Sequence, residues 1–183
     1  MIATKSPSST VFVFDYSKHS SLPTDLVCKP QHRCLGHTAE GYGLAWNPLA
    51  AGQLLSGSDD STVCLWDINQ GGAEVQAQSI FKGHTDVVED VDWSKHHSHI
   101  FGSVGDDQQL LIWDTRNATT PKCAVANAHG ESAEVNCVAF NPFNEFLLAT
   151  GGCDNAVRVW DMRNMKQSLH QCEGHRDGVF QVL

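Results

Sequence analysis

The stretch GHTDVVEDVDWSKHHSHIFGSVGDDQQLLIWD, residues 83–114, covers most of one period of a repeat that runs through this chain. It opens on a small residue followed by histidine and closes on Trp-Asp. The opening pair occurs four times, at Gly36-His37, Gly83-His84, Ala128-His129 and Gly174-His175. The closing pair occurs three times, at Trp66-Asp67, Trp113-Asp114 and Trp160-Asp161. Successive histidines are 47, 45 and 46 residues apart, and successive Trp-Asp pairs 47 and 47. Such a period is typical of a β-propeller, in which each repeat forms one four-stranded blade.

Each period contains four segments with strand character. A short apolar run follows the histidine and predicts the innermost strand, at 42–46, 89–93 and 136–140. A second strand is expected near 54–58, 100–103 and 146–150. The third alternates apolar and polar residues into the tryptophan, at 62–66, 109–113 and 156–160, and period two is strand patterning. A weaker fourth strand is expected near 76–82, 122–127 and 167–172.

These segments divide the chain into units. We expect a partial blade and loop over 1–35, full blades over 36–82, 83–128 and 129–173, and the start of another blade over 174–183, with a strand opening at Val179–Leu183. Residues 1–15 are expected to supply two strands of the first partial blade, and the strand before Gly36 to close it. The prediction is an all-β propeller with about three complete blades and partial blades at both ends of an incomplete ring, a fragment of a longer protein or a truncated gene model.

A polar set recurs once in each blade. A hydroxyl residue lies four positions before a turn aspartate, which lies six before the tryptophan. The three sets are His37, Ser56, Asp60 and Trp66; His84, Ser103, Asp107 and Trp113; and His129, Thr150, Asp154 and Trp160. A catalytic triad is one interpretation, but a nucleophilic site is normally single, whereas a fold-maintaining network recurs with the repeat. We therefore expect a structural chain of hydrogen bonds from carboxylate to imidazole to hydroxyl to indole N–H.

Composition narrows the possible functions. With 41% hydrophobic residues, the 183-residue chain can build a core, and it has no apolar run of about 18 residues that would predict a membrane span. The seven cysteines include no C-x-x-C pair, which favours buried thiols over disulfides or zinc. The net charge of −9 and the absence of a Lys/Arg cluster argue against direct nucleic-acid binding and permit basic partners.

The Gly-His, turn Asp and Trp-Asp elements resemble the WD-repeat family over residues 31–183. Longer strings are similar to the histone-binding WD-repeat proteins called retinoblastoma-binding proteins, the chromatin assembly factor small subunit type. These strings are IATKSPSS (2–9), VFDYSKH (13–19), EGYGLAWNP (40–48), GHTDVVEDV (83–91), FGSVGDDQQL (101–110), IWDTR (112–116) and EFLLATG (145–151).

This resemblance implies a ring of seven blades and a non-catalytic, nuclear, histone-binding scaffold without a cofactor. It implies a subunit of chromatin assembly, remodelling or histone-modifying complexes that contributes to transcription regulation. Its partners would be other subunits and the tails of histones three and four, with no direct nucleic acid and no membrane. In that family a helix and later blades form the groove for histone four. This sequence does not contain them, so we do not infer that groove.

Residues just before and at the start of each innermost strand should line one mouth of the central channel. Aligned on the aromatic residue that ends each strand, these positions supply carboxylates, an amide and aromatic rings: Glu40, Tyr42, Glu89, Glu134, Asn136 and, if the next repeat keeps the spacing, Phe180. Carboxylates pair with Lys or Arg, and aromatic faces hold cations, so the set suits a basic peptide. The resemblance places the histone three tail there. A solvated acidic rim is the alternative, and Gly178 lacks the carboxylate expected at its position.

Other interpretations remain. The strings WDTR (113–116) and WDMR (160–163) resemble the W-D-x-R box of substrate receptors for a cullin ubiquitin ligase, in which Arg116 and Arg163 would face the adaptor. An enzyme with its site at the channel mouth is not supported by a lone nucleophile, metal set or phosphate loop. The run His96-His97-Ser98-His99 lacks the ligand spacing of a zinc site, so we expect a solvated turn and no metal.

Overall fold

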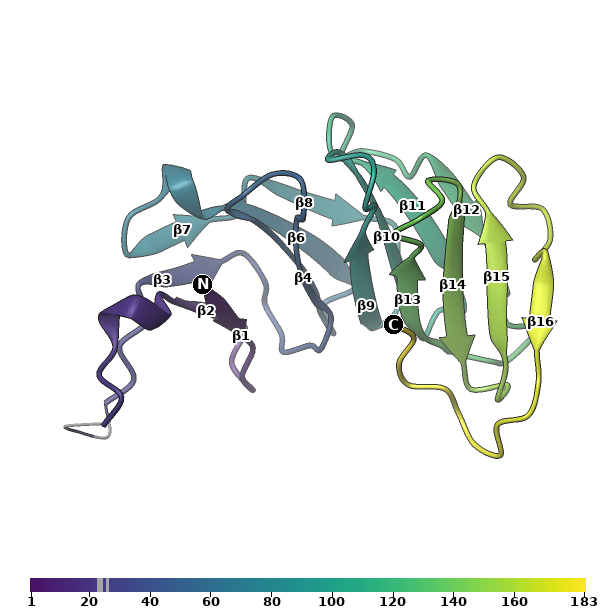
Figure 1. The fold of residues 1–183 in the computed structure, drawn as a ribbon, viewed down its shortest axis with the longest axis horizontal. Helices are drawn as coiled ribbons and strands as arrows, with labels where there is room; N and C mark the ends of the chain where they lie inside the picture. Colours follow the sequence, from purple (N-terminus) through teal and green to yellow (C-terminus); the bar gives the residue numbers. More distant parts are fainter. Residues whose placement is uncertain (23–24, 26) are drawn as a thin grey trace.

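The computed structural model describes residues 1–22, 25 and 27–183. It contains four four-stranded sheets that follow one another along a curve (Figure 1). Three sheets are antiparallel meanders, and their first strands, β4, β9 and β13, contact one another in succession. The first meander contains β4 (Leu44–Trp46), β5 (Gln53–Gly57), β6 (Thr62–Asp67) and β8 (Ser79–Lys82). This arrangement confirms the predicted all-β fold of propeller blades.

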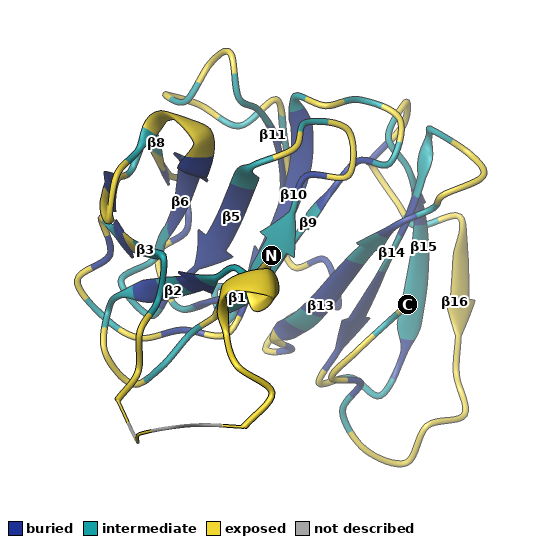
Figure 2. Cartoon of the chain, turned by 60° about the vertical axis from the view of Figure 1, so that its left-hand side comes forward, coloured by how far each residue is buried: buried dark blue, intermediate teal, exposed yellow. Residues whose placement is uncertain are grey.

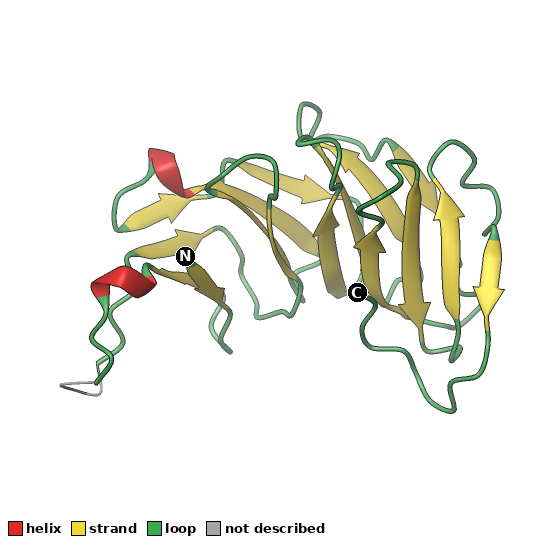
Figure 3. Cartoon of the chain, in the orientation of Figure 1, coloured by secondary structure: helices red, strands yellow, loops and turns green. Residues whose placement is uncertain are grey.

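The second and third meanders repeat the pattern. The second contains β9 (Val88–Trp93), β10 (Ile100–Gly105), β11 (Leu110–Asp114) and β12 (Cys123–Val125). The third contains β13 (Val135–Phe140), β14 (Leu147–Gly152), β15 (Val157–Asp161) and β16 (His170–Cys172). Turns and loops join the strands, and the helical segments of the described residues are two short 3-10 turns, Tyr16–Lys18 and Ile68–Gln70 (Figure 3). Among the described residues, no helix is long and apolar enough to span a membrane.

The N-terminal sheet contains an element that the sequence did not predict. Strands β1 (Ile2–Thr4), β2 (Val11–Phe14) and β3 (His32–Leu35) form the expected antiparallel part. The fourth strand, β7 (Glu74–Gln76), pairs parallel with β3, although it lies between β6 and β8 in the chain. The fourth strand expected near 76–82 is present as β8, but the prediction missed the additional strand β7 directly before it. Val75, 5% exposed, enters the core against β3, and this burial holds β7 in place.

The C-terminal segment also differs from expectation. Within residues 174–183, all of which the structure describes, there is no strand, so the strand predicted to open at Val179 is wrong. The Val179 N–H donates to the carbonyl of Gly152 at 3.0 Å, and its side chain packs against Gly151. This single backbone bond anchors the segment at the end of β14 without continuing into a ladder.

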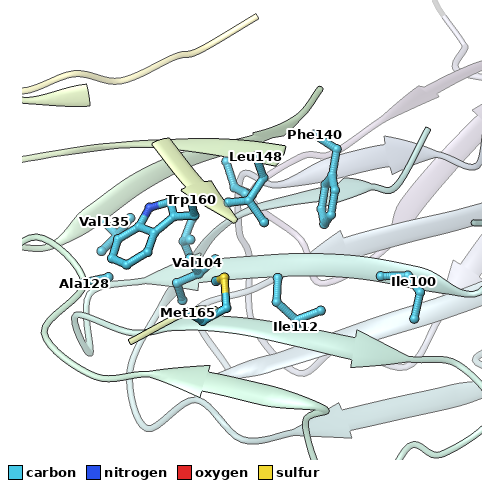
Figure 4. Packing of buried hydrophobic residues seen from close by; sticks show 11 residues of the cluster. Ile100, Val104, Ile112, Ala128, Val135, Phe140, Leu148, Trp160 and Met165 are labelled. Atoms are coloured by element: carbon cyan, nitrogen blue, oxygen red, sulfur yellow. The ribbon is translucent and has the colours of Figure 1, made fainter. Parts of the chain in front are cut away.

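The core lies between neighbouring sheets rather than inside one of them. Burial is concentrated in the middle strands, while the outermost strand β16 is exposed (Figure 2). Between the second and third meanders, Trp160, Phe140 and Leu148 pack against Val104 and Ile112 (Figure 4). Because burial of one such side chain contributes about 1.5–3 kcal/mol, each blade is stabilised mainly by its neighbours.

Two carboxylates join the inner strands β9 and β13. Asp90 accepts a hydrogen bond from the Val138 N–H at 3.0 Å, and Asp92 accepts one from the Phe140 N–H at 2.8 Å. Burial raises the pKa of Asp90 to about 6. Strands of different blades do not pair directly here, so these side chains satisfy backbone donors that would otherwise lack partners.

The polar sets of the second and third meanders form hydrogen-bonded chains. In the third, the Trp160 N–H donates to Thr150 Oγ at 2.9 Å, and the hydroxyl lies 2.7 Å from His129 Nε2. His129 Nδ1 lies 2.7 Å from Asp154, and since a carboxylate only accepts, this nitrogen carries the proton. The second meander repeats these contacts with Trp113, Ser103, His84 and Asp107 at 2.8, 2.7 and 2.9 Å.

Burial lowers the pKa of His129, so the imidazole is neutral at pH 7 and can accept from the hydroxyl. Thr150 and Ser103 are fully buried. Their burial and their recurrence in successive blades favour a structural role for these chains over a catalytic one.

The first meander departs from this pattern. His37 keeps its contacts with Asp60 at 3.0 Å and Ser56 Oγ at 3.1 Å. Trp66, however, donates to the carbonyl of Leu35 at 2.9 Å and not to Ser56, contrary to the expected chain. The ammonium of Lys5 takes its place, donating to Ser56 Oγ at 2.7 Å and also to the Gly57 carbonyl. Burial lowers the pKa of Lys5 to about 8.

Replacing Thr150 with valine tests the structural role of these chains. The change keeps the shape of the side chain but leaves the Trp160 N–H and His129 Nε2 without a partner. We expect the free energy of unfolding to fall by about 1–3 kcal/mol for each group left unpaired. Urea unfolding followed by tryptophan fluorescence measures it. The control is Thr38→Val, the same change at an exposed position. Equal midpoints for both variants would show that the hydroxyl is dispensable.

Candidate functional site

A hollow of about 580 Å³ opens where the inner strands β9 and β13 begin. Five of the six residues expected to bind a peptide line it: Tyr42, Glu89, Glu134, Asn136 and Phe180. Asp90, Cys153 and Gln181 complete the lining. We call this site the acidic hollow, because its three charged lining residues are all carboxylates.

Different elements position these side chains. Tyr42 lies in the loop before β4, and its ring is 69% exposed. Asn136 lies in β13, and its amide donates to the Val179 carbonyl at 3.1 Å. This bond fixes the backbone next to Phe180, whose ring is 76% exposed. Two largely exposed aromatic residues therefore line the hollow.

The carboxylates are crowded and partly withdrawn from water. Burial, together with a hydrogen bond and repulsion from Asp106, raises the pKa of Glu89 to about 7. Burial and the nearby charge of Glu134 also raise the pKa of Asp106. Like charges in one site disfavour ionisation, so a proton is retained near neutral pH. A cation entering the hollow would relieve this repulsion and favour the ionised carboxylates.

Glu40 is the expected residue that the structure places outside the lining. It is exposed, four residues before β4. Its backbone carbonyl accepts from the Asp59 N–H at 2.9 Å and from Ser58 Oγ at 2.6 Å. These bonds tie its backbone to the turn between β5 and β6, and Glu40 is not among the residues that line the hollow.

Sequence reasoning missed Asp90, Cys153, Gln181 and Asp106. Asp90 could have been predicted, since it directly follows Glu89 near the start of β9. Cys153 lies in the turn after β14, and its Sγ lies 3.5 Å from both Glu134 Oε2 and Asn136 Oδ1. Burial raises the pKa of this thiol, and Glu134 raises it further. Cys153 directly precedes the turn aspartate Asp154, as Asp106 precedes Asp107, so the repeat marks this position although it was not among the predicted residues.

The two arginines of the W-D-x-R strings lie at the opposite ends of the blades. Arg116 pairs with Asp114 and Arg163 with Asp161, each at 2.6 Å. Hydrogen bonds from these guanidinium groups lower the pKa of both carboxylates to about 2. Each arginine thus bonds to the aspartate of its own Trp-Asp pair, yet its side chain remains more than 60% exposed.

The histidine-rich turn does not gather metal ligands. His97 pairs with Glu145 at 2.9 Å, and its ring lies 6.2 Å from that of His99. Across the part of the chain that the structure describes, no group of three or more His, Cys, Asp or Glu residues could hold a metal ion.

A known repeat family matches this chain three times. Residues 28–67, 75–114 and 122–161 match the model described as WD domain, G-beta repeat. Each matched stretch ends at the aspartate of a Trp-Asp pair, and together the three cover more than half of the chain. Each match contains one strand of the preceding sheet (β3, β8 or β12) and the first three strands of the next, so the sequence repeat is offset from the blades by one strand.

Cys153 provides a test of the electrostatics of the acidic hollow. Replacing Glu134 with glutamine removes a charge that raises the thiol pKa, so maleimide should modify Cys153 several times faster at pH 7. Cys172, exposed on β16, should react at an unchanged rate in both proteins. Mass spectrometry of the two peptides measures both rates. If Cys153 reacts no faster in the variant, Glu134 does not control the potential in the hollow.

Proposed function

Because the chain belongs to the WD-repeat family, we propose that it is a non-catalytic, histone-binding scaffold subunit of chromatin complexes. WD repeats provide protein-interaction surfaces. Under this proposal, the acidic hollow holds a basic histone tail, in particular that of histone three. The observation that carries the proposal is the convergence of three carboxylates and two exposed aromatic rings at one mouth of the blades.

The chemistry of the hollow matches a basic peptide on three counts. Glu89 and Glu134 can pair with lysine or arginine side chains, while Asp90 adds negative charge but accepts hydrogen bonds from backbone N–H groups. Tyr42 and Phe180 offer aromatic faces to a cation or its aliphatic stem. A volume of about 580 Å³ accommodates one or two long side chains, so a short segment of an extended tail suffices.

The finer assignment to chromatin rests on sequence resemblance. Strings such as EGYGLAWNP (40–48) and GHTDVVEDV (83–91), which contain Tyr42 and Glu89, resemble the histone-binding retinoblastoma-binding proteins. We propose on this basis a nuclear location and the subunits of chromatin assembly, remodelling or histone-modifying complexes as partners.

A second candidate function is substrate receptor for a cullin ubiquitin ligase. The exposed guanidinium groups of Arg116 and Arg163, held in the same way on neighbouring blades, favour it. Pull-down with histone peptides and with the ligase adaptor separates the two candidates. Retention of the adaptor by the wild type, and its loss in Arg116→Ala and Arg163→Ala, would support the second.

Replacing both Glu89 and Glu134 with glutamine should weaken binding of a histone three tail peptide. Exposed pairs contribute about 0.2–1 kcal/mol each, so losing two of them should weaken binding by about two- to thirtyfold, and this loss should shrink at high salt. Fluorescence anisotropy with a labelled tail peptide measures it. Glu131→Gln, at an exposed carboxylate outside the hollow, is the matched control. An affinity unchanged by the double substitution would place the tail elsewhere.

The raised pKa of Glu89 predicts a pH dependence of tail binding. A bound cation favours the ionised carboxylate, so below pH 7 binding must first remove a proton. Affinity for an N-acetylated tail peptide should therefore rise between pH 6 and pH 8. In Glu89→Gln this rise should flatten, since the titrating group is gone. Parallel profiles for the two proteins would show that Glu89 does not contact the cation.

A further inference from the structure

A second hollow, of about 410 Å³, opens between the second and third meanders. Its floor consists of Ile100, Ile112 and Met165, which are at most 8% exposed and belong to the core cluster between these blades (Figure 4). Apolar core side chains are thus reachable from outside at this point. We call this site the basic pocket, for the residues His97, Lys122 and Arg163 at its rim.

The basic pocket lies at the far ends of the strands that begin at the acidic hollow. Glu89 stands near the start of β9, whereas His97 follows the end of that strand. Glu134 immediately precedes β13, whereas Phe146 follows its end. The two hollows therefore face opposite sides of the blades, and a ligand in one does not reach the other.

The charges of the two hollows are opposite. No carboxylate lines the basic pocket, although the chain carries a net charge of −9. Lys122 is exposed and forms no ion pair within the part of the chain that the structure describes. Arg163 is held by Asp161, and its guanidinium lies 4.4 Å from the centre of the Phe146 ring. His97 is held by Glu145 at 2.9 Å. Lys122 and the edge of Arg163 that does not bond to Asp161 therefore remain available to a carboxylate, beside an apolar floor.

The sulfur-containing side chains make the apolar part adaptable. Met162 and Met165 lie on one side of the basic pocket, and Cys123 lies in β12 across from them. Methionine has three rotatable bonds and a polarisable sulfur, so it can repack around differently shaped apolar groups. This lining suits an inserted aliphatic or aromatic side chain better than a small polar ligand.

From these observations we propose that the basic pocket is a second docking site, and that its occupant is an acidic segment of a partner protein. One or two large apolar side chains of that segment insert against Ile100, Ile112 and Met165. Flanking carboxylates pair with Lys122 and with the free edge of Arg163. The site is separate from the acidic hollow, so this proposal does not depend on the binding of histone tails.

The methionine residues of the chain allow binding at the basic pocket to be followed by NMR. Of its three methionines, Met162 and Met165 line the basic pocket, and Met1 lies outside it. Labelling the methionine methyl groups with carbon-13 gives three resonances. On titration with the peptide Asp-Glu-Leu-Phe-Asp-Glu, we expect saturable shifts of Met162 and Met165, with Met1 unchanged. A basic histone three tail peptide should leave Met162 and Met165 unshifted, so the two proposals can fail separately.

Substitutions in the protein and in the peptide test separately whether charge and apolar side chains are needed for binding. Lys122→Glu should weaken binding by about three- to tenfold, whereas Lys166→Glu, at an exposed lysine outside the pocket, should not. A peptide with serine in place of leucine and phenylalanine should not bind. The proposal is overturned if Met162 and Met165 do not shift at millimolar peptide. It is equally overturned if a peptide with asparagine and glutamine in place of its acids, or the serine peptide, binds as well.

Discussion

One buried hydroxyl oxygen in each of two blades holds together parts of the chain that are distant in sequence. Thr150 Oγ accepts from the indole of Trp160 on β15 and contacts His129, which lies before β13. The loop that enters the blade is thereby fixed to its two middle strands. Glu134 lies five residues after His129, and Glu89 five residues after His84. The same interaction that stabilises a blade thus sets the position of a carboxylate at the acidic hollow.

Features that repeat along the chain could be predicted from the sequence, because each blade forms from its own local pattern. The alternation of side chains and the Trp-Asp spacing predicted the three meanders. The register of the inner strands identified most of the residues that line the acidic hollow. Cys153 and Asp106 escaped prediction because they reach the hollow from turns between β14 and β15 and between β10 and β11. They are equivalent positions of two repeats, 47 residues apart, but their closeness to the entrances of β9 and β13 depends on how the strands pair.

The first meander illustrates the same limit. Its residues repeat the polar set in full, yet the indole of Trp66 bonds to Leu35 and the ammonium of Lys5 reaches Ser56. Lys5 directly follows β1 of the N-terminal sheet and is 51 positions from Ser56. A side chain supplied by a neighbouring blade can therefore replace an internal member of the set. No pattern within residues 36–82 carries information about such a contact, because it is decided by packing between blades.

Strand β7 has a consequence for how the blades lose their structure. It belongs to the connection between β6 and β8, but its backbone bonds are with β3 of the preceding sheet. In an ordinary repeat array, neighbours interact through side chains, and one unit can fray while the next stays intact. Here three residues from the connection within the first meander, Glu74–Gln76, form a strand of the preceding sheet. When β3 frays, β7 loses its backbone partner, and the connection that leads into β8 is no longer fixed. The N-terminal sheet and the first meander should therefore unfold together as one cooperative unit, whereas the later blades can unfold separately.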